Sequence, residues 1–255
     1  MGLFLSRPPD TMTTSQKQLS TAPDPFGKAL KDYLSGLHDA ALAVHTSGFD
    51  DEEWPVEMFF QDSRSMRWYA RRALRLARGR ILDVGAGAGS YSLLLQKQGF
   101  DVEALEISAL AAEVIADRGV KKVTNADFYN FTTDRRYDTL LLLMNGVGIA
   151  GRLEGLPRLL ARCKELLAPD GQIIMDTTDF AHVYDDLDVP RPTDRYIGEV
   201  LYTWEYNGEK SEPFWWVFVD PDTLAKAAHD AHLRCEVIGS NPKYSEYLLR
   251  LTPED

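Results

Sequence analysis

The sequence predicts an α/β protein built on a doubly wound sheet. First, the apolar run 81–84 carries a β-branched residue at each end, as expected of a buried parallel strand. Second, glycines and a helical apolar period follow that run directly, so that strand, tight turn and helix come in succession. Third, the 255 residues are enough for one such domain with an extension.

Composition and charge narrow the classes of partner. The hydrophobic fraction of 44% is ordinary for a globular protein, and the net charge of −11 repels phosphate backbones, so no nucleic-acid partner is expected. No apolar run approaches the length of a membrane span, so no membrane association is expected. Cys163 and Cys235 lie far apart without metal-binding spacing, which indicates buried thiols in a reducing, cytoplasmic compartment and no metal site.

The N-terminal part of the chain reads as a tail followed by helices. Residues 1–25 are rich in Ser, Thr, Pro and Gln, and we expect a disordered tail. Apolar residues recur at helical spacing over 26–46, which predicts one amphipathic helix. A second helix is predicted over 63–78. Residues 26–62 would then form a helical cap before a main domain over 63–255, either covering the ligand site or packing on the sheet edge.

The turn after the first strand carries glycines at alternate positions, in the pattern Asp83-x-Gly85-x-Gly87-x-Gly89. Glycine allows positive φ and lets a ligand approach the backbone closely. Dinucleotide folds require G-x-G-x-x-G, but here the third glycine comes one residue early and Ser90 occupies the required position. A carboxylate at the strand end also favours a cationic ligand over a pyrophosphate. A turn that binds nothing is the remaining alternative.

This motif resembles the first motif of class I S-adenosylmethionine-dependent methyltransferases, which have a seven-stranded, Rossmann-like mixed sheet of order 3-2-1-4-5-7-6. The next strand, 101–107, ends on Glu106, about one βα step beyond the turn, where a carboxylate can accept both ribose hydroxyls. A solvent-exposed strand-end Glu is the plainer alternative. The family also places an acid and an apolar neighbour beside adenine, and Asp127 and Phe128 fit those roles, although Asp127 could simply cap a helix.

The fourth strand, 137–143, leads to Met144-Asn145-Gly146-Val147. Family members that methylate amide or nucleobase nitrogens usually carry Asn/Asp-Pro-Pro-aromatic there, so this departure argues against those substrates. A helix over 153–167 and a strand over 172–176 complete a resemblance that covers about residues 63–180. The cofactor contacts that it implies are Asp83, Gly85, Ala86, Gly87, Gly89, Glu106, Ile107, Asp127, Phe128 and Asn145.

The C-terminal third offers weaker catalytic candidates and an aromatic hairpin. Asn145 could orient a substrate, and Asp179 with His182 is the nearest acid–imidazole pair, although a loop histidine is more often just solvated. Strand-like runs over 196–206 and 213–220 flank Asn207-Gly208, a strong hairpin signal. Alternation puts the rings of Tyr202, Trp204 and Tyr206 on one face, as core, as substrate pocket or as dimer surface. A helix over 220–232 and strands over 234–238 and 246–251 would finish the sheet.

The sequence therefore predicts an enzyme that transfers the methyl group of S-adenosyl-L-methionine to a small-molecule acceptor by in-line displacement, with a homodimer as an option. Because the sulfonium already activates the methyl group, orientation can supply much of the catalysis without a dedicated catalytic residue. Two alternatives remain at this point: a nicotinamide-dependent oxidoreductase, and a module that binds S-adenosylmethionine without catalysis.

Overall fold

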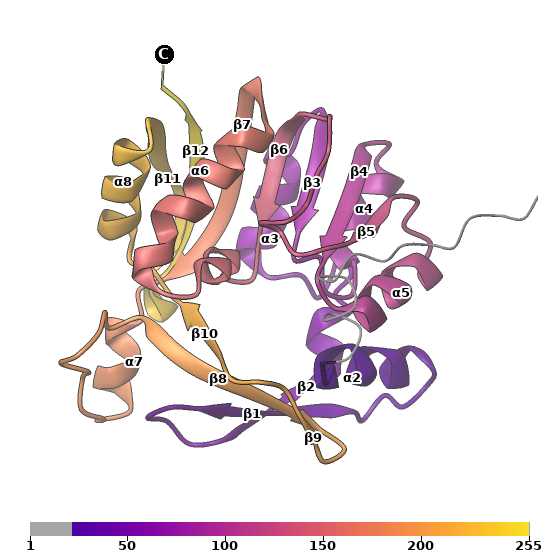
Figure 1. Ribbon diagram of the computed structural model, residues 1–255, viewed down its shortest axis with the longest axis vertical. Coiled ribbons are helices and arrows are strands. Elements are labelled where there is room, and N and C mark those ends of the chain that lie inside the picture. Colours follow the sequence, from indigo (N-terminus) through magenta and orange to yellow (C-terminus); the bar gives the residue numbers. More distant parts are fainter. Residues whose placement is uncertain (1–21, 255) are drawn as a thin grey trace, which may run out of the picture.

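A computed structural model describes residues 22–254, and its larger sheet has seven strands in the order β11-β12-β7-β6-β3-β4-β5 (Figure 1). The pairings from β5 to β7 are parallel, and β12 lies antiparallel between β7 and β11. Numbered by sequence within this sheet, the order is the expected 3-2-1-4-5-7-6. The strands are β3 (Arg80–Val84), β4 (Asp101–Glu106), β5 (Val123–Asn125), β6 (Tyr137–Leu142), β7 (Leu167–Thr178), β11 (Leu233–Asn241) and β12 (Glu246–Pro253).

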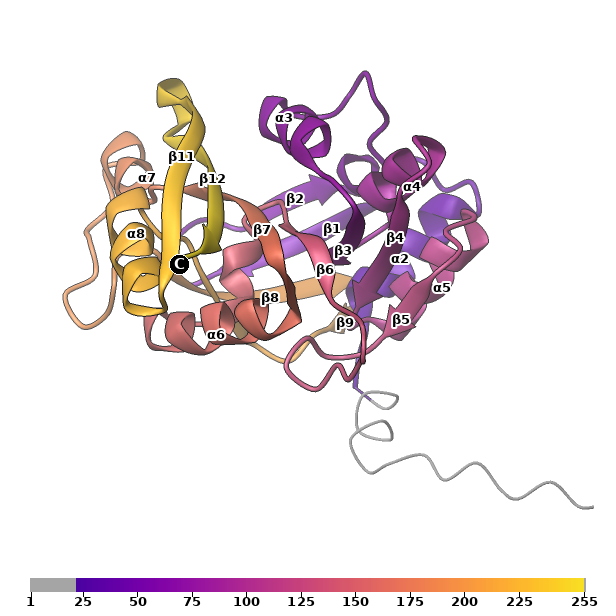
Figure 2. The ribbon, with the colours of Figure 1, turned by 90° about the horizontal axis from the view of Figure 1, so that it is seen from above.

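Helices cover both faces of this sheet, as a doubly wound fold requires (Figure 2). One face carries α3 (Trp68–Leu76) and α4 (Ser90–Lys97), and the other carries α6 (Leu156–Leu166) and α8 (Pro221–Asp230). The helix α5 (Ala109–Asp117) follows β4 and ends before Gly119, which has a φ of 96°. Among residues 22–254, none of the helices combines the length and apolarity needed to cross a bilayer.

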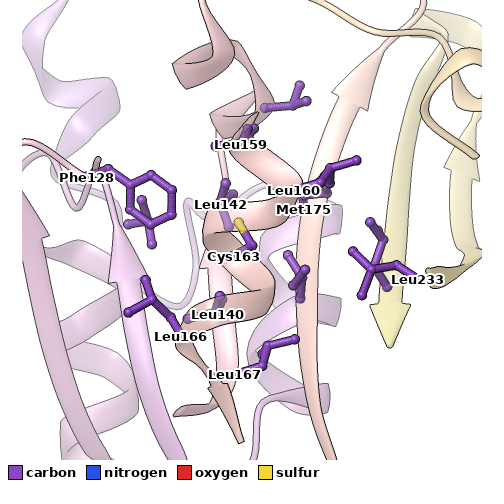
Figure 3. Close-up of a cluster of buried hydrophobic side chains, with 14 of the residues drawn as sticks. Phe128, Leu140, Leu142, Leu159, Leu160, Cys163, Leu166, Leu167, Met175 and Leu233 are labelled. Atoms are coloured by element: carbon purple, nitrogen blue, oxygen red, sulfur yellow. The ribbon is translucent and has the colours of Figure 1, made fainter. Parts of the chain in front are cut away.

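The main core lies between the sheet and α6, where strand and helix side chains interlock (Figure 3). Leu140, Leu142 and Met175 point from β6 and β7 toward Leu160 and Cys163 of the helix, and all five are fully buried. Burial of each such aliphatic side chain contributes about 1.5–3 kcal/mol. This face therefore gives the carboxyl ends of the parallel strands a rigid support.

A second, antiparallel sheet lies across the carboxyl ends of the parallel strands (Figure 1). Its order is β10-β8-β1-β2, with β9 paired to β8; the strands are β1 (Ala41–Thr46), β2 (Glu52–Pro55), β8 (Glu199–Tyr206), β9 (Glu209–Lys210) and β10 (Phe214–Val217). The predicted hairpin is confirmed: Asn207 and Gly208 have φ values of 50° and 78°, as a type I′ turn needs. The hairpin is thus one half of a sheet whose other half comes from the N-terminal segment.

The predicted helix over 26–46 is wrong beyond Leu34. The helix α2 (Pro25–Leu34) ends before Gly36, whose φ of 112° is typical of a helix terminus, and residues 41–46 form β1. Leu42 and Val44 are buried on one face of that strand, which pairs with β8. Residues 26–62 are therefore no all-helical cap, since they also contain β2 and the 3-10 turn η1 (Val56–Phe59).

The predicted tail over 1–25 falls largely outside the described residues. At its end, Asp24 caps α2 by accepting a hydrogen bond from the Gly27 N–H at 2.8 Å, and Pro25 is the first residue of the helix. The second predicted N-terminal helix is present as α3, which begins at Trp68, five residues later than expected.

Candidate functional site

The three glycines after β3 adopt positive φ values of 68°, 58° and 75° at Gly85, Gly87 and Gly89. A Cβ at Gly85 or Gly87 would meet only Ile149 at 3.7 Å or Phe26 at 3.9 Å, so both present bare backbone. A Cβ at Gly89 would come within 2.9 Å of Ile115, so the absence of a side chain at Gly89 lets the start of α4 pack closely against α5. The first two glycines can admit a ligand, and the third serves packing.

Glu106 ends β4 and holds the glycine turn in place. Its Oε2 accepts a hydrogen bond from the Gly87 N–H at 2.8 Å, and its Oε1 accepts one from the Ser108 N–H at 2.9 Å. Burial raises the pKa of this carboxyl to about 7, while the two N–H donors act in the opposite direction. Each carboxylate oxygen keeps further acceptor capacity. Ile107 beside it is half exposed and adds an apolar surface at the same edge.

Asp83 and Ala86 lie behind the turn. The Asp83 carboxylate is buried and accepts a hydrogen bond from the Ser92 Oγ at 2.6 Å, so it ties β3 to α4. Burial raises the pKa of Asp83 to about 6. Ala86 is also buried, and its N–H donates to the Leu105 carbonyl at 3.1 Å. These two predicted contacts thus support the open backbone from within.

After β5, the two predicted adenine neighbours, Asp127 and Phe128, have different surroundings and different roles. Asp127 Oδ1 accepts hydrogen bonds from the N–H groups of Tyr129 and Asn130 at 2.9 and 3.0 Å, which is the capping role that the sequence left open. The ring of Phe128 is buried in the main core beside Leu142 (Figure 3). Asp127 stays at the strand edge with its second oxygen available, whereas the Phe128 ring serves the core.

The segment after β6 is strained and is held by an acid that the sequence analysis missed. Met144 and Asn145 have consecutive positive φ values of 61° and 56°, uncommon for residues with side chains. The Asn145 N–H donates to Asp176 Oδ2 at 2.9 Å, and the Thr178 hydroxyl donates to Asn145 Oδ1 at 3.1 Å. Asp176 ends an apolar strand run just as Glu106 does, and that signal could have found it.

The predicted acid–imidazole pair does not form. His182 Nδ1 lies 2.5 Å from the backbone carbonyl oxygen of Asp179, and the Asp179 carboxylate accepts from the Ala181 N–H at 3.0 Å. Both residues therefore serve the start of α7 (Ala181–Asp186). One oxygen of the Asp179 carboxylate caps the following turn, and this local hydrogen bond competes with a contact to the imidazole.

Aromatic rings connect the second sheet to both loops of the candidate site. The ring of Trp204 lies 4.9 Å from that of Phe26 and 5.0 Å from that of Phe214, measured between centroids. Phe26 in turn faces Gly87, while the indole of Trp216 lies so close to Gly148 that no Cβ would fit there. The rings thus bridge from the second sheet to the glycine turn and to the β6–α6 connection.

Comparison with known proteins identifies the family. A family model described as a methyltransferase domain matches residues 58–236. A S-adenosylmethionine-dependent methyltransferase from Bacteroides fragilis, solved in complex with S-adenosyl-L-homocysteine, is 37% identical with a TM-score of 0.83; the match covers 91% of this chain and 96% of that one. This chain belongs to the class I S-adenosylmethionine-dependent methyltransferases. Its cofactor is S-adenosylmethionine, and the nicotinamide alternative is not favoured.

More distant structures share the fold of this methyltransferase. DesVI from Streptomyces venezuelae is 22% identical with a TM-score of 0.55, covering 72% of this chain and 92% of that one. CalS10, a S-adenosylmethionine-bound amino pentose methyltransferase from Micromonospora echinaspora, is 17% identical with a TM-score of 0.52, covering 74% and 92%. No curated protein matches the chain.

Proposed function

We propose that this methyltransferase transfers the methyl group of S-adenosylmethionine to a small-molecule acceptor by in-line displacement. The observation that carries the proposal is the bare backbone of Gly85 and Gly87 beside Glu106, which binds the Gly87 N–H. The aromatic rings of the second sheet enclose the same edge and favour a small acceptor over a macromolecule. The net charge of −11 also disfavours a nucleic acid as acceptor.

Each cofactor contact in this proposal follows from the chemistry of the side chain. Glu106 would accept the ribose hydroxyls with its remaining lone pairs. Ile107 would lie against the base, and the second oxygen of Asp127 would accept from the adenine amino group. Gly85 and Gly87 would let the amino-acid part approach the backbone, and Asn145 would face the reacting end. Four further residues would not contact the cofactor but would hold these groups in place: Asp83, Ala86, Gly89 and Phe128.

The chemistry asks for orientation more than for proton transfer. S-adenosylmethionine supplies a methyl group already activated by a sulfonium. The protein has to hold the acceptor in line and to exclude water, and orientation of this kind can supply about 7–11 kcal/mol of the barrier. The second sheet can cover the site, since its Trp204 contacts Phe26 beside the glycine turn and its Trp216 contacts Gly148 in the β6–α6 connection.

The glycine turn provides the test. A Gly87→Val variant forces a branched side chain into positive φ at the proposed site, and we expect it to lose S-adenosylhomocysteine binding in calorimetry while the fold remains. Gly99→Val is the matched control, because Gly99 has a φ of 92° and no atom within 4 Å of its Cβ position. It should lose similar stability and keep binding. Binding by Gly87→Val at wild-type affinity would remove the turn from the site.

Catalysis needs a separate measurement, because binding alone would also suit a non-catalytic module. Transfer of a labelled methyl group from S-adenosylmethionine to members of a metabolite panel should occur with the wild-type protein. Tight S-adenosylhomocysteine binding without any transfer would favour the module instead.

A further inference from the structure

The buried carboxylate of Asp176 has one oxygen without a partner. Asp176 lies in β7 with 2% of its surface exposed, and its Oδ2 accepts from the Asn145 N–H. Its Oδ1 is also buried, and no hydrogen-bond partner for it occurs within residues 22–254. A buried, unpaired acceptor is costly, and native proteins keep such a group where a ligand or a function uses it.

Backbone N–H groups of Asn145, Met144 and Asp176 itself stabilise the charge of the Asp176 carboxylate, but the side chains of the described residues around it supply no cation that balances it. Tyr69 of α3 and Tyr91 of α4 face it; burial raises the pKa of both phenols, and the charge of Asp176 raises it further. Glu246 of β12 faces it as well and adds negative charge. Arg67 also acts on both phenols, but it is bound to Glu246 Oε1 at 2.8 Å. Asp83 adds a further acid beyond Tyr91. The surroundings therefore favour a cation at Oδ1.

Asp176 also lies where the parallel strands reach their carboxyl ends. It is next to the strained Met144–Asn145 pair at the end of β6, where ligands of doubly wound sheets gather. Thr178 points to the same side two residues farther toward the second sheet, and its hydroxyl binds the Asn145 side chain. Asn145 and Thr178 are partly exposed and neutral, whereas Asp176 beside them is buried.

We propose that the methyl acceptor is an amine, and that Asp176 Oδ1 binds its ammonium group and takes a proton from it before methyl transfer. This inference rests on the function proposed above. An N–H bond of the ammonium breaks as an O–H bond forms on Asp176, which frees the nitrogen lone pair. That pair then forms the N–C bond while the S–C bond breaks and leaves its electrons on sulfur. The products are a methylated ammonium and S-adenosylhomocysteine, and Asp176 returns its proton to water.

The acidity of Asp176 suits this step. Burial raises the pKa of its carboxyl to about 7, so it is a better base near neutral pH than an exposed aspartate. An alcohol would give the site no positive charge to balance. An amine reaches the site already protonated and complements the buried negative charge.

Two ligands of one shape test the proposal: benzylammonium and benzyl alcohol, titrated by calorimetry into protein saturated with S-adenosylhomocysteine. Asp176→Asn keeps the size of the side chain and an oxygen for the Asn145 N–H, but it removes the charge. We expect Asp176→Asn to lower the affinity for benzylammonium at least ten-fold and to change the affinity for benzyl alcohol by no more than about two-fold. Glu103→Gln is the control, because Glu103 is a buried acid that accepts a hydrogen bond from the Tyr137 hydroxyl at 2.8 Å. This variant should bind both ligands with wild-type affinity.

The wild-type protein gives a second measurement that needs no variant. Benzylammonium stays charged between pH 5 and 8, so its affinity should fall as Asp176 is protonated below about pH 7, while that of benzyl alcohol stays level. Equal effects on both ligands, or no benzylammonium binding at millimolar concentration, would overturn the amine assignment. If wild-type protein does not bind S-adenosylhomocysteine at all, the proposed function itself fails.

Discussion

Glu106 uses a single carboxylate to fix the glycine turn and to border the space in front of it. We predict that Glu106→Gln lowers the affinity for S-adenosylhomocysteine about ten- to a hundred-fold, through loss of a charged acceptor. The affinity for a 2′-deoxy analogue should fall much less, because that ligand already lacks the hydroxyl that Glu106 would bind. Calorimetry on both ligands makes the comparison.

The second ligand also serves as the control in that experiment. Any disturbance of the Gly87 N–H contact weakens both ligands by the same factor, so only the difference between them reports on the ribose. Equal losses would mean that Glu106 acts through the turn alone.

At single residues, the sequence predicted what a local pattern encodes. Glu106 stood out because its distance from the glycine motif is set by one βα step. Asp176 ends an apolar run in the same way, but no motif at a fixed spacing points to it. Its contact with the Asn145 N–H depends on left-handed backbone at Met144 and Asn145, and of these two residues only Asn is a type that favours such backbone. For Asp127, capping of the following turn was the competing role, and the structure shows that role for one of its oxygens. Asp179 also caps the turn after it with one oxygen, which the sequence analysis did not expect.

Among the elements, the strand β1 shows where pattern reading fails. The series Leu30, Leu34, Leu37, Ala41 and Val44 keeps a helical period, yet Leu42 and Val44 also alternate as strand residues do. The choice depends on β8, which pairs Val44 with Trp204 from far along the chain. The hairpin at Asn207–Gly208 was predictable because its turn chemistry and its partner strand are local.

The strand β8 places its rings as the alternation predicts: Tyr202, Trp204 and Tyr206 lie in one aromatic cluster inside the molecule. On the other face, Glu205 contacts His45 at 3.0 Å. We predict that Trp204→Ala keeps S-adenosylhomocysteine affinity and the sedimentation coefficient but loses turnover of an acceptor found on the metabolite panel. Removing this ring opens the surface beside Phe26.

Thr203→Ala on the opposite face of β8 is the matched control and should turn over acceptor normally. If Trp204→Ala changes a dimer into a monomer that still turns over acceptor, the rings serve an interface and not the pocket.

For the whole molecule, buried acids set the pH dependence of stability. Burial raises the pKa values of Asp83, Glu106 and Asp176 to about 6, 7 and 7, above those of the unfolded chain. The folded state therefore binds more protons than the unfolded state between about pH 4.5 and 7, and its stability falls as pH rises through that window. We predict a free energy of unfolding about 1–3 kcal/mol lower at pH 8 than at pH 6.

Thermal and urea unfolding at both pH values measure this difference. Asp176→Asn should be more stable than wild type at pH 8, by about 0.5–2 kcal/mol, because a functional acid costs stability. At pH 5.5 the two proteins should be nearly equal, since Asp176 is then protonated. A wild-type protein that gains stability from pH 6 to pH 8 would contradict the assignment of these acids.

The second sheet also fixes an order of events during synthesis. His45 and Glu205, which face each other across β1 and β8, are 160 residues apart. At translation rates of about 5–20 residues per second, β1 leaves the ribosome roughly 8–30 s before its partner exists. In that interval the nascent chain exposes an unpaired strand edge, a template for association with other chains. The acidic run Asp50-Asp51-Glu52-Glu53 leads into β2, which pairs with the other edge of β1, so its charge lies one strand away from the unpaired edge and repels other nascent chains until β8 arrives.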